Sequence, residues 1–478
     1  MLGSGYIFLT KNQNERVITT GAENASAVNT SSTAQDILSD APSFNRVRRR
    51  SSANIVNLDA FKNFTPVINQ SRGGSLESIA ELLRDPEMMR KHTIRLCLQT
   101  LASVYQDLNM SDPQMFCTFS ALNISKLFPV DTAYVRCLAA AGSLACMYFK
   151  QCHEAILMVH KAKKIDPKTD RNTSFFIHLH AGRVYFMNGK WTHALDILNA
   201  PAVKRKSASV LLKNEAMWLK SVLLFQNGPR KEAEKLARDL YDLATKQEHW
   251  VGQFWGCTLL LLHAVDSLRD PAIMMEYTAT LTRIWDSAPE RHKNNVTLNL
   301  LFFGVTADTQ IRLGLPVSFQ EILDELNYWL PQCEPHHWMS FLGLLRIAKT
   351  VYNADLNKFK SDLPSMISVC RLLSNFLKQK KTSYLWQGVF GGQATFTLTI
   401  GKGMYKLFRG LEHYLKGKPV KAIASWKKGL DMPFENATPY LQAFFHRCIA
   451  KVTTDETDKS RHLLEAAALY DRLGATLN

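Results

Sequence analysis

Three arginines followed by two serines, Arg48–Arg50 and Ser51–Ser52, carry the most definite chemistry in the sequence. Arginines stand two and three positions before both serine hydroxyls, the pattern that basic-directed kinases such as the cyclic-nucleotide-dependent ones phosphorylate. A phosphate would add about −1.5 to −2 charges beside the arginines. We therefore expect Ser51 or Ser52 to be a phosphorylation site. The alternative is that the arginines form a nuclear-localisation patch.

Cys333, His336 and His337 form the densest cluster of side chains that could bind a metal. A zinc site needs four such ligands within tetrahedral reach, and no second cluster has complementary spacing. His178 and His180 are separated by one residue of a predicted helix, so their side chains should point to different sides of it. We therefore expect no metal site.

The closest sequence to a phosphate-binding loop is Phe396–Gly403 (FTLTIGKG). It lacks the first glycine of that motif and has Gly403 where a hydroxyl side chain is required. There is also no serine elbow of the GxSxG type. Cys152 and His153 are adjacent in a predicted helix and cannot face each other as a nucleophile and its base. We therefore expect no catalytic residue, no cofactor and no enzymatic activity.

Composition indicates a folded protein with no membrane span. Hydrophobic residues make up 46% of the 478 residues, which is ample for a buried interior. The longest apolar run, 255–265, is shorter than the roughly 20 residues that cross a bilayer. The start of the chain has no secretory leader pattern, and the nine cysteines include no CxxC pair, which is typical of a reducing compartment. We expect a cytoplasmic protein, with the nucleus as the alternative.

The chain divides by composition into residues 1–75 and 76–478. The first part is rich in Ser, Thr, Asn and Ala and has no sustained period, which predicts a disordered polar tail. In the second part apolar residues recur at intervals of three and four, as at Ile94, Leu98 and Leu101, which predicts helices almost throughout. Predicted helices include 191–199, 208–226, 230–245, 271–286, 292–313, 384–415 and 457–473.

These helices are mostly 12–20 residues long with short links, and no segment alternates as a strand would. Short links are typical of stacked antiparallel helix pairs. The predicted fold is therefore all-α: a superhelical array of helix pairs, or solenoid, after the N-terminal tail. A division of this array into two lobes near 268–290 is a further option.

An internal repeat supports the array. A large apolar residue, a glycine and, five residues after the glycine, an alanine recur three times, with the glycine–alanine pairs Gly189–Ala194, Gly228–Ala233 and Gly417–Ala422. A glycine tolerates the left-handed backbone that ends a helix, and a small alanine lets the next helix pack closely. The pattern resembles the tetratricopeptide repeat. Gly189 and Gly228 are 39 residues apart, longer than that family's 34-residue unit.

A second resemblance concerns the order of elements over residues 76–478. Asp85–Met88, Gly182–Leu198, Glu215–Ala244 and Ala466–Ala475 are similar to the helical region that follows the ATPase module in soluble-type class III nucleotide cyclases and in hybrid sensor kinases. Those families carry their chemistry in upstream modules that this chain does not contain. The resemblance implies a regulatory or scaffolding segment of such an enzyme, or a partner to one.

The formal charge of +16 leaves two classes of partner open. A positive protein attracts acidic partners in general, nucleic acid included. The basic clusters Lys161–Lys164, Lys204–Lys206 and Lys378–Lys381 fall at predicted helix ends, where the helix dipole favours them. The nine tryptophans stand at helical spacing, which favours core packing over base stacking. We expect a protein-binding scaffold, with a nucleic-acid-binding helical repeat as the alternative, and identify no small-molecule substrate.

Overall fold

The computed structural model describes residues 84–107, 111–149, 152–165, 171–200, 210–267, 269–332, 338–378, 399–433 and 437–475. In these ranges every regular element is a helix and none is a strand, so the all-α fold class is confirmed. All described residues belong to one compact unit, Val67–Asn478. The expected tail, residues 1–75, lies outside the described residues.

The helices in the first half of the described chain are α4 (Pro86–Asp107), α5 (Ser111–Ser125), α6 (Thr132–Phe149), α7 (Cys152–Ile165), α8 (Arg171–Met187), α9 (Trp191–Leu198), α10 (Val210–Asn227), α11 (Arg230–Lys246), α12 (Trp250–Asp266) and α13 (Pro271–Asp286). Those in the second half are α14 (Glu290–Lys293), α15 (Val296–Arg312), α16 (Phe319–Trp329), the 3-10 helix η1 (Leu330–Gln332), α17 (Trp338–Asn353), α18 (Leu363–Lys378), α20 (Thr399–Leu415), α21 (Pro419–Leu430), α22 (Pro439–Val452) and α23 (Glu456–Leu473).

Capping side chains explain where several helices begin. The Asp270 carboxylate accepts a hydrogen bond from the backbone N–H two residues on, and Pro271 occupies the first position of α13. Asp455 accepts from two N–H groups in the first turn of α23. Both caps satisfy donors that have no partner inside the helix. Helices α13 and α23 therefore begin within one residue of the predicted 271–286 and 457–473.

One predicted helix, 292–313, is two helices in the structure. Helix α14 ends at Lys293 and α15 begins at Val296. Between them the Asn295 side chain accepts hydrogen bonds of 3.0 and 3.2 Å from N–H groups in the first turn of α15. Asparagine favours a cap over a helix interior because its side chain competes for backbone donors. The predicted helix 384–415 is described only from Thr399 onward.

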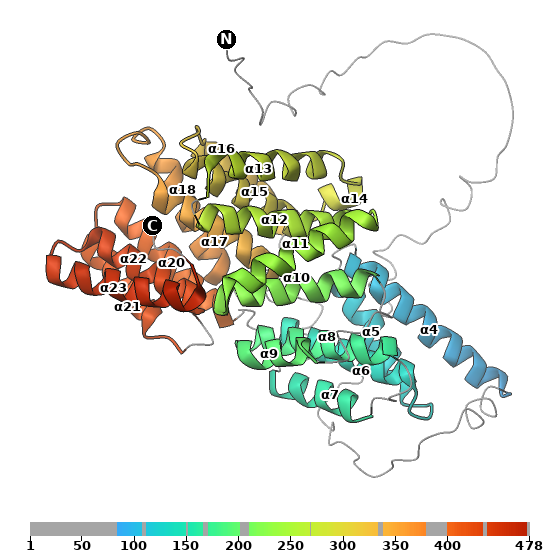
Figure 1. Ribbon diagram of the computed structural model, residues 1–478. Helices are drawn as coiled ribbons and strands as arrows, with labels where there is room; N and C mark the ends of the chain where they lie inside the picture. Colours follow the sequence, from blue (N-terminus) through green and yellow to red (C-terminus); the bar gives the residue numbers. More distant parts are fainter. Residues whose placement is uncertain are drawn as a thin grey trace, which may run out of the picture. The chain divides into compact units, whose positions relative to one another are not determined.

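Helices that follow each other in sequence pack together, and helices two or three positions apart in the chain also make contact. The first kind includes α6 on α7, α10 on α11, α20 on α21 and α22 on α23; the second includes α6 with α8, α10 with α12, α12 with α15, and α15 with α17. The two C-terminal helices, α22 and α23, also contact α10, which lies much earlier in the chain (Figure 1). There Thr438 Oγ1 donates to Gln226 Oε1 at 3.1 Å. A stack in which each repeat touches only its neighbours lacks such a contact.

Helices α15 and α17 approach each other backbone to backbone. A Cβ atom built on Gly304 would lie 2.3 Å from the Gly343 carbonyl oxygen, and one on Gly343 would lie 2.3 Å from the Leu300 carbonyl oxygen. The seven tryptophans whose side chains are described are buried or half-buried, as core packing requires. Among the helices that the structure describes, none has the length and apolar character to cross a bilayer.

Candidate functional site

The glycines and alanines of the repeat lie at three turns between helices. Gly189 follows α8 and Gly417 follows α20, with left-handed φ angles of 72° and 67°. Ala194, Ala233 and Ala422 lie near the starts of α9, α11 and α21, and all three side chains are buried. In two of the three turns the glycine therefore adopts the conformation that the sequence pattern predicts.

Gly228, the remaining turn glycine, differs. It follows α10, but its φ is not in the left-handed region, so the expectation of a left-handed backbone there was wrong. Pro229 comes next, and the residue before a proline is restricted toward extended conformations. A Cβ on Gly228 would lie 2.9 Å from Leu224 Cδ2, the end of a flexible side chain that can move, and 3.3 Å from Leu224 Cα, so the space there is tight but not closed.

Several predicted residues lie outside the described residues, among them Ser51 and Ser52 and the cluster of Cys333, His336 and His337. Within the described ranges no group of three potential ligands could hold a metal ion. His178 Nδ1 contacts the Ser174 carbonyl of its own helix, whereas His180 Nδ1 contacts the Ser143 hydroxyl on α6. These two histidines therefore do not converge on one site.

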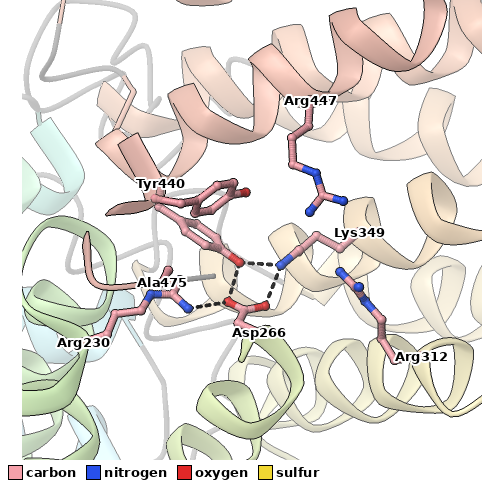
Figure 2. A pocket seen from close by; sticks show the side chains of 8 residues that line it. Arg230, Asp266, Arg312, Lys349, Tyr440, Arg447 and Ala475 are labelled. Atoms are coloured by element: carbon pink, nitrogen blue, oxygen red, sulfur yellow. Dashed lines mark hydrogen bonds and ion pairs between the residues drawn. The ribbon is translucent and has the colours of Figure 1, made fainter. Parts of the chain in front are cut away.

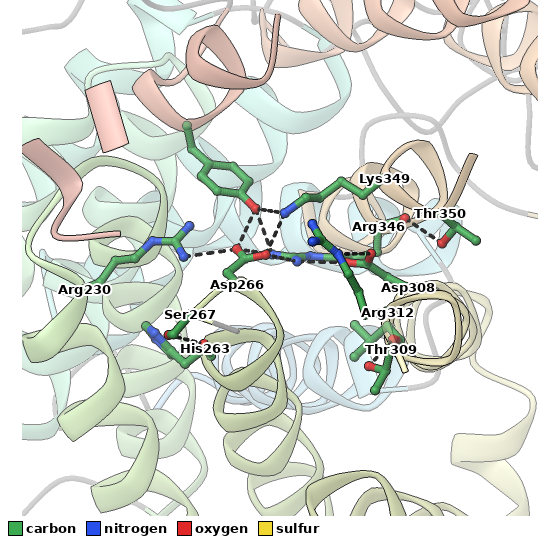
Figure 3. Close-up of polar contacts among 12 residues, drawn as sticks. Arg230, His263, Asp266, Ser267, Asp308, Thr309, Arg312, Arg346, Lys349 and Thr350 are labelled. Atoms are coloured by element: carbon green, nitrogen blue, oxygen red, sulfur yellow. Dashed lines mark hydrogen bonds and ion pairs between the residues drawn. The ribbon is translucent and has the colours of Figure 1, made fainter. Parts of the chain in front are cut away.

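The structure brings together a group of charges that sequence reasoning did not identify. We call it the Asp266 cluster; its members are Arg230, Asp266, Asp308, Arg346, Lys349 and Tyr440. They come from α11, α12, α15, α17 and α22 (Figure 3). Asp266 is the last residue of α12 and its side chain is 3% exposed. Some members of the cluster come before residues 268–290 in the sequence and the others come after them. Helices on both sides of the possible division into two lobes therefore share one buried group of charges.

Asp266 is at the centre of the cluster. One of its carboxylate oxygens accepts from Arg346 Nη1 at 2.7 Å and from Lys349 Nζ at 2.6 Å. The other accepts from Arg346 Nη2 at 3.0 Å, from Arg230 Nη1 at 3.1 Å and from the Tyr440 hydroxyl. Charge-assisted hydrogen bonds of this kind are the strong ones in proteins. A single carboxylate therefore binds side chains from three other helices.

The cationic side chains are further held by a second carboxylate and by aromatic rings. Asp308, on α15, accepts from Arg346 Nη1 at 3.1 Å. The Arg230 guanidinium lies 4.1 Å from the centre of the Phe225 ring and 4.7 Å from that of Tyr440. A cation over an aromatic face is stabilised by the ring's quadrupole, more so when water is excluded.

Burial and neighbouring charges shift the protonation equilibria of the cluster. Burial alone would raise the pKa of Asp266, but the charges of Arg346, Lys349 and Arg230 outweigh it and hold that pKa well below its usual value. Burial lowers the pKa of Lys349 to about 8, although Asp266 opposes the shift. Burial also raises the pKa of the Tyr440 phenol. At neutral pH Asp266 is therefore charged and Tyr440 is neutral.

A cavity lies directly beside Lys349. The cavity itself measures about 10 Å³, and the hollow around it, which includes open solvent, measures about 250 Å³. Arg312 and Arg447 lie on the other side of Lys349 from Arg230, with their guanidinium groups directed toward the cavity (Figure 2). Its lining residues are Arg230, Asp266, Arg312, Lys349, Tyr440, Arg447, Tyr470 and Ala475.

A second feature is an exposed apolar surface on α4. We call it the α4 face; its members are Met89, Ile94, Leu96, Cys97, Leu101 and Val104. Five of them are 40–53% exposed, and Cys97 is exposed as well. Met89 and Leu96, Ile94 and Leu101, and Cys97 and Val104 are each seven residues apart, so the two members of each pair lie on the same side of the helix. Together the three pairs cover roughly half of the helix circumference. The opposite side packs on α5 (Figure 1).

That opposite side is held by polar contacts as well. The Arg95 guanidinium, fully buried, makes two hydrogen bonds to the Asp131 carboxylate, at 2.7 and 3.2 Å. Gln99 Nε2 donates to the Ala133 carbonyl at 3.0 Å. These bonds determine how α4 is rotated about its axis, so the apolar face turns away from the described helices.

Comparison with known proteins adds no relative. No family model matches the chain, and no curated protein matches it significantly. The similarities to tetratricopeptide repeats and to the cyclase-associated helical region therefore stay predictions from the residues quoted above.

Proposed function

We propose that this chain is a non-catalytic helical-repeat scaffold that binds another protein, and that the α4 face is part of its binding surface. The observation that carries the proposal is the row of exposed apolar side chains on α4. Soluble proteins rarely leave such side chains grouped on one face unless a partner covers them. Burial by a partner contributes about 1 kcal/mol for each half-exposed side chain, or several kcal/mol for the face.

The finer architecture belongs to the same proposal. Successive helix pairs with short turns, and left-handed glycines at two of the repeat turns, support a solenoid of the tetratricopeptide type. The return of α22 and α23 to α10 makes it a curled array and not an open one. The resemblance to the cyclase-associated region would make the partner a signalling enzyme such as a nucleotide cyclase, regulated from a scaffold without activity of its own.

Nucleic acid is the alternative partner because of the net charge of +16. In α7 the exposed Lys163 and Lys164 occupy the last turn, and Lys378 ends α18. At these positions the negative end of the helix dipole stabilises lysine without any ligand. Their placement is therefore explained by the helices themselves, and we favour protein as the partner.

A pull-down tests this proposal. The bait is the full chain at about 0.3 M salt, where contacts to phosphates are weakened and apolar contacts persist. The test variant carries Leu101→Glu and Val104→Glu on the α4 face. The matched control carries Val420→Glu and Leu464→Glu, two apolar residues that are 78% and 70% exposed on other helices.

We expect the parent and the control to retain the same protein partners, and the α4 variant to lose them. Glutamate is a good helix former, so α4 itself should persist in the variant. Circular dichroism and melting of all three proteins check this. Retention of a defined RNA with no protein would favour the nucleic-acid alternative, and equal protein recovery by all three baits would exclude the α4 face.

A further inference from the structure

The cavity beside the Asp266 cluster has more positive than negative charge around it. Five cationic side chains line it or bind its carboxylates, namely Arg230, Arg312, Arg346, Lys349 and Arg447. Two carboxylates, Asp266 and Asp308, face them. Buried charge without a counter-charge is costly, because it loses its hydration and gains no partner. The excess positive charge would therefore be stabilised by a bound anion.

Several donors at this site are also unused. Arg230 is 4% exposed, and its Nε and Nη2 groups are buried without a hydrogen-bond partner among the described residues. Lys349 uses two of its three N–H bonds, for Asp266 and for Tyr440. The only carboxylate within ion-pair distance of Arg312 in the described chain is Asp308, at 3.9 Å, too far for a hydrogen bond.

Arg447 completes the arrangement. No described carboxylate lies within ion-pair distance of it, and its guanidinium is 5.6 Å from the centre of the Tyr352 ring. Arg312 and Arg447 are both partly exposed, so the cavity is reached from solvent at their end. Figure 2 shows the guanidinium groups of Arg312 and Arg447 on the same side of the Lys349 ammonium, so three cationic groups surround this part of the cavity.

We propose that this pocket binds a compact oxyanion, a phosphate group, between Arg312, Arg447 and Lys349. Planar guanidinium groups match the oxygens of phosphate two at a time, and an ammonium adds a point charge. A surplus of three positive charges favours a multiply charged anion over chloride or a single carboxylate. The cavity itself, of about 10 Å³, has room for about one water molecule, so a phosphate group would lie at its solvent-open end, beside the guanidinium groups of Arg312 and Arg447.

The bound anion would stabilise the folded arrangement of the helices, because residues from both halves of the described chain line the pocket. Arg230 comes from α11, Arg312 from α15, Lys349 from α17 and Arg447 from α22. A ligand that binds only this assembled state stabilises it. The anion would therefore strengthen the return contact of the C-terminal helices. This inference does not depend on protein binding by the α4 face.

The test is calorimetric titration of the full chain with sulfate, which does not titrate between pH 6 and 10. Inorganic phosphate and glycerol 3-phosphate are titrated in parallel arms. The variants are Arg312→Met and Arg447→Met, with Arg312→Lys to keep the charge. The control is Arg461→Met, because Arg461 is 60% exposed on α23 and pairs with exposed Asp458.

We expect the two methionine variants to bind at least about tenfold more weakly than the parent, since each loses a charged hydrogen-bond donor. Arg312→Lys should lose less, and Arg461→Met should bind as the parent does. Binding of both phosphates would assign the pocket to a phosphate ester, and binding of the inorganic ion alone to free phosphate. No binding of any probe at about 20 mM would overturn the proposal, as would equal binding by all variants.

The pH dependence of sulfate affinity is a second measurement. It would not change if Lys349 only stabilised the fold and did not contact the anion. A bound anion favours the charged form of Lys349, whose pKa burial lowers to about 8. Sulfate affinity should therefore fall above pH 8, by up to about tenfold per pH unit, and stay nearly flat from pH 6 to 7.5.

The charged or titratable groups that face Lys349 are Arg230, Asp266, Asp308, Arg312, Arg346, Tyr440, Arg447 and Tyr470. Of these, Asp266 is ionised throughout, and burial raises the pKa of Tyr470 to about 12. A flat affinity across pH 8–10 would contradict the placement of the anion beside Lys349.

Discussion

Replacing Asp266 with alanine is expected to lower the free energy of unfolding by about 3–5 kcal/mol, the range for breaking a buried ion pair from one side. The substitution leaves Arg230 and Lys349 without a described carboxylate at hydrogen-bond distance. It also removes two of the three hydrogen bonds that Arg346 makes to carboxylates. The remaining charges repel one another in a site from which water is largely excluded.

Chemical denaturation of the parent and of Asp266→Ala measures this effect. The control is Asp458→Ala, because Asp458 pairs with Arg461 at the surface, where both side chains are at least 43% exposed. Exposed pairs contribute about 0–1 kcal/mol, so the control should stay close to the parent. Equal losses in the two variants would show that the Asp266 cluster is no more important than a surface pair.

The same substitution should change the acid sensitivity of the protein. Because the folded-state pKa of Asp266 is held below its ordinary 3.8, its contribution to stability is present above that value. The contribution is lost as pH falls toward the folded-state pKa, where the carboxylate takes up a proton. The stability difference between parent and Asp266→Ala should therefore narrow in acid.

Replacing Gly304 with alanine is expected to destabilise the protein by about 3 kcal/mol, at the upper end for an added methyl group in a packed interior. The new Cβ would meet the carbonyl oxygen of Gly343 at 2.3 Å. This neighbour is backbone and cannot rotate away, so α15 and α17 must separate. These helices also carry Asp308 and Arg346, so their separation would disturb the Asp266 cluster.

Gly401→Ala is the matched control, because Gly401 also lies inside an α-helix. Among the described residues, the nearest atom to a new Cβ there is Leu377 Cδ2, at 3.9 Å. There alanine should be neutral or stabilise by up to about 1 kcal/mol, since it restricts the unfolded chain. Thermal and urea unfolding measure the stability of both variants relative to the parent. Destabilisation of similar size in both would mean that the close helix approach is not what selects glycine at position 304.

The helices could be predicted well from the sequence because the residues that start a helix, and the spacing of its apolar residues, lie within or next to the helix itself. Asp270 and Pro271 mark the start of α13 from adjacent positions, and apolar residues at helical intervals mark its body. The prediction failed at Asn295, where an unbroken apolar period hid a capping residue. It also failed on the backbone of Gly228, where the following proline was the relevant neighbour.

The Asp266 cluster could not be predicted in this way, because its partners are distant in sequence. Arg346 lies 80 residues after Asp266, and Tyr440 lies 174 residues after it. The sequence does contain a weak indication, which is a charged residue at the end of the apolar run 255–265 and two cations inside the apolar helix α17. Charges in such surroundings require partners when buried. Only the tertiary contacts show which residues those partners are.

The α4 face illustrates a different limit. The intervals of Ile94, Leu98 and Leu101 predicted a helix correctly, but periodicity does not say which apolar side is covered. In the structure Leu98 is half-buried while Ile94 and Leu101 are exposed. The rotation of α4 depends on Arg95 pairing with Asp131, 36 residues away.

The most direct test of the central claim, that the α4 face is open to another protein, is the rate at which Cys97 reacts with a maleimide. Cys97 is exposed on that face, whereas the other cysteines whose side chains the structure describes are buried, and peptide mass spectrometry follows Cys97 individually. The rate is measured in the full chain and in a variant that lacks residues 1–75. We predict equal, fast labelling in both, and protection only when a captured partner is bound. Slow labelling in the full chain that becomes fast on deletion would contradict the account, because the chain's own N-terminal residues would then cover the face.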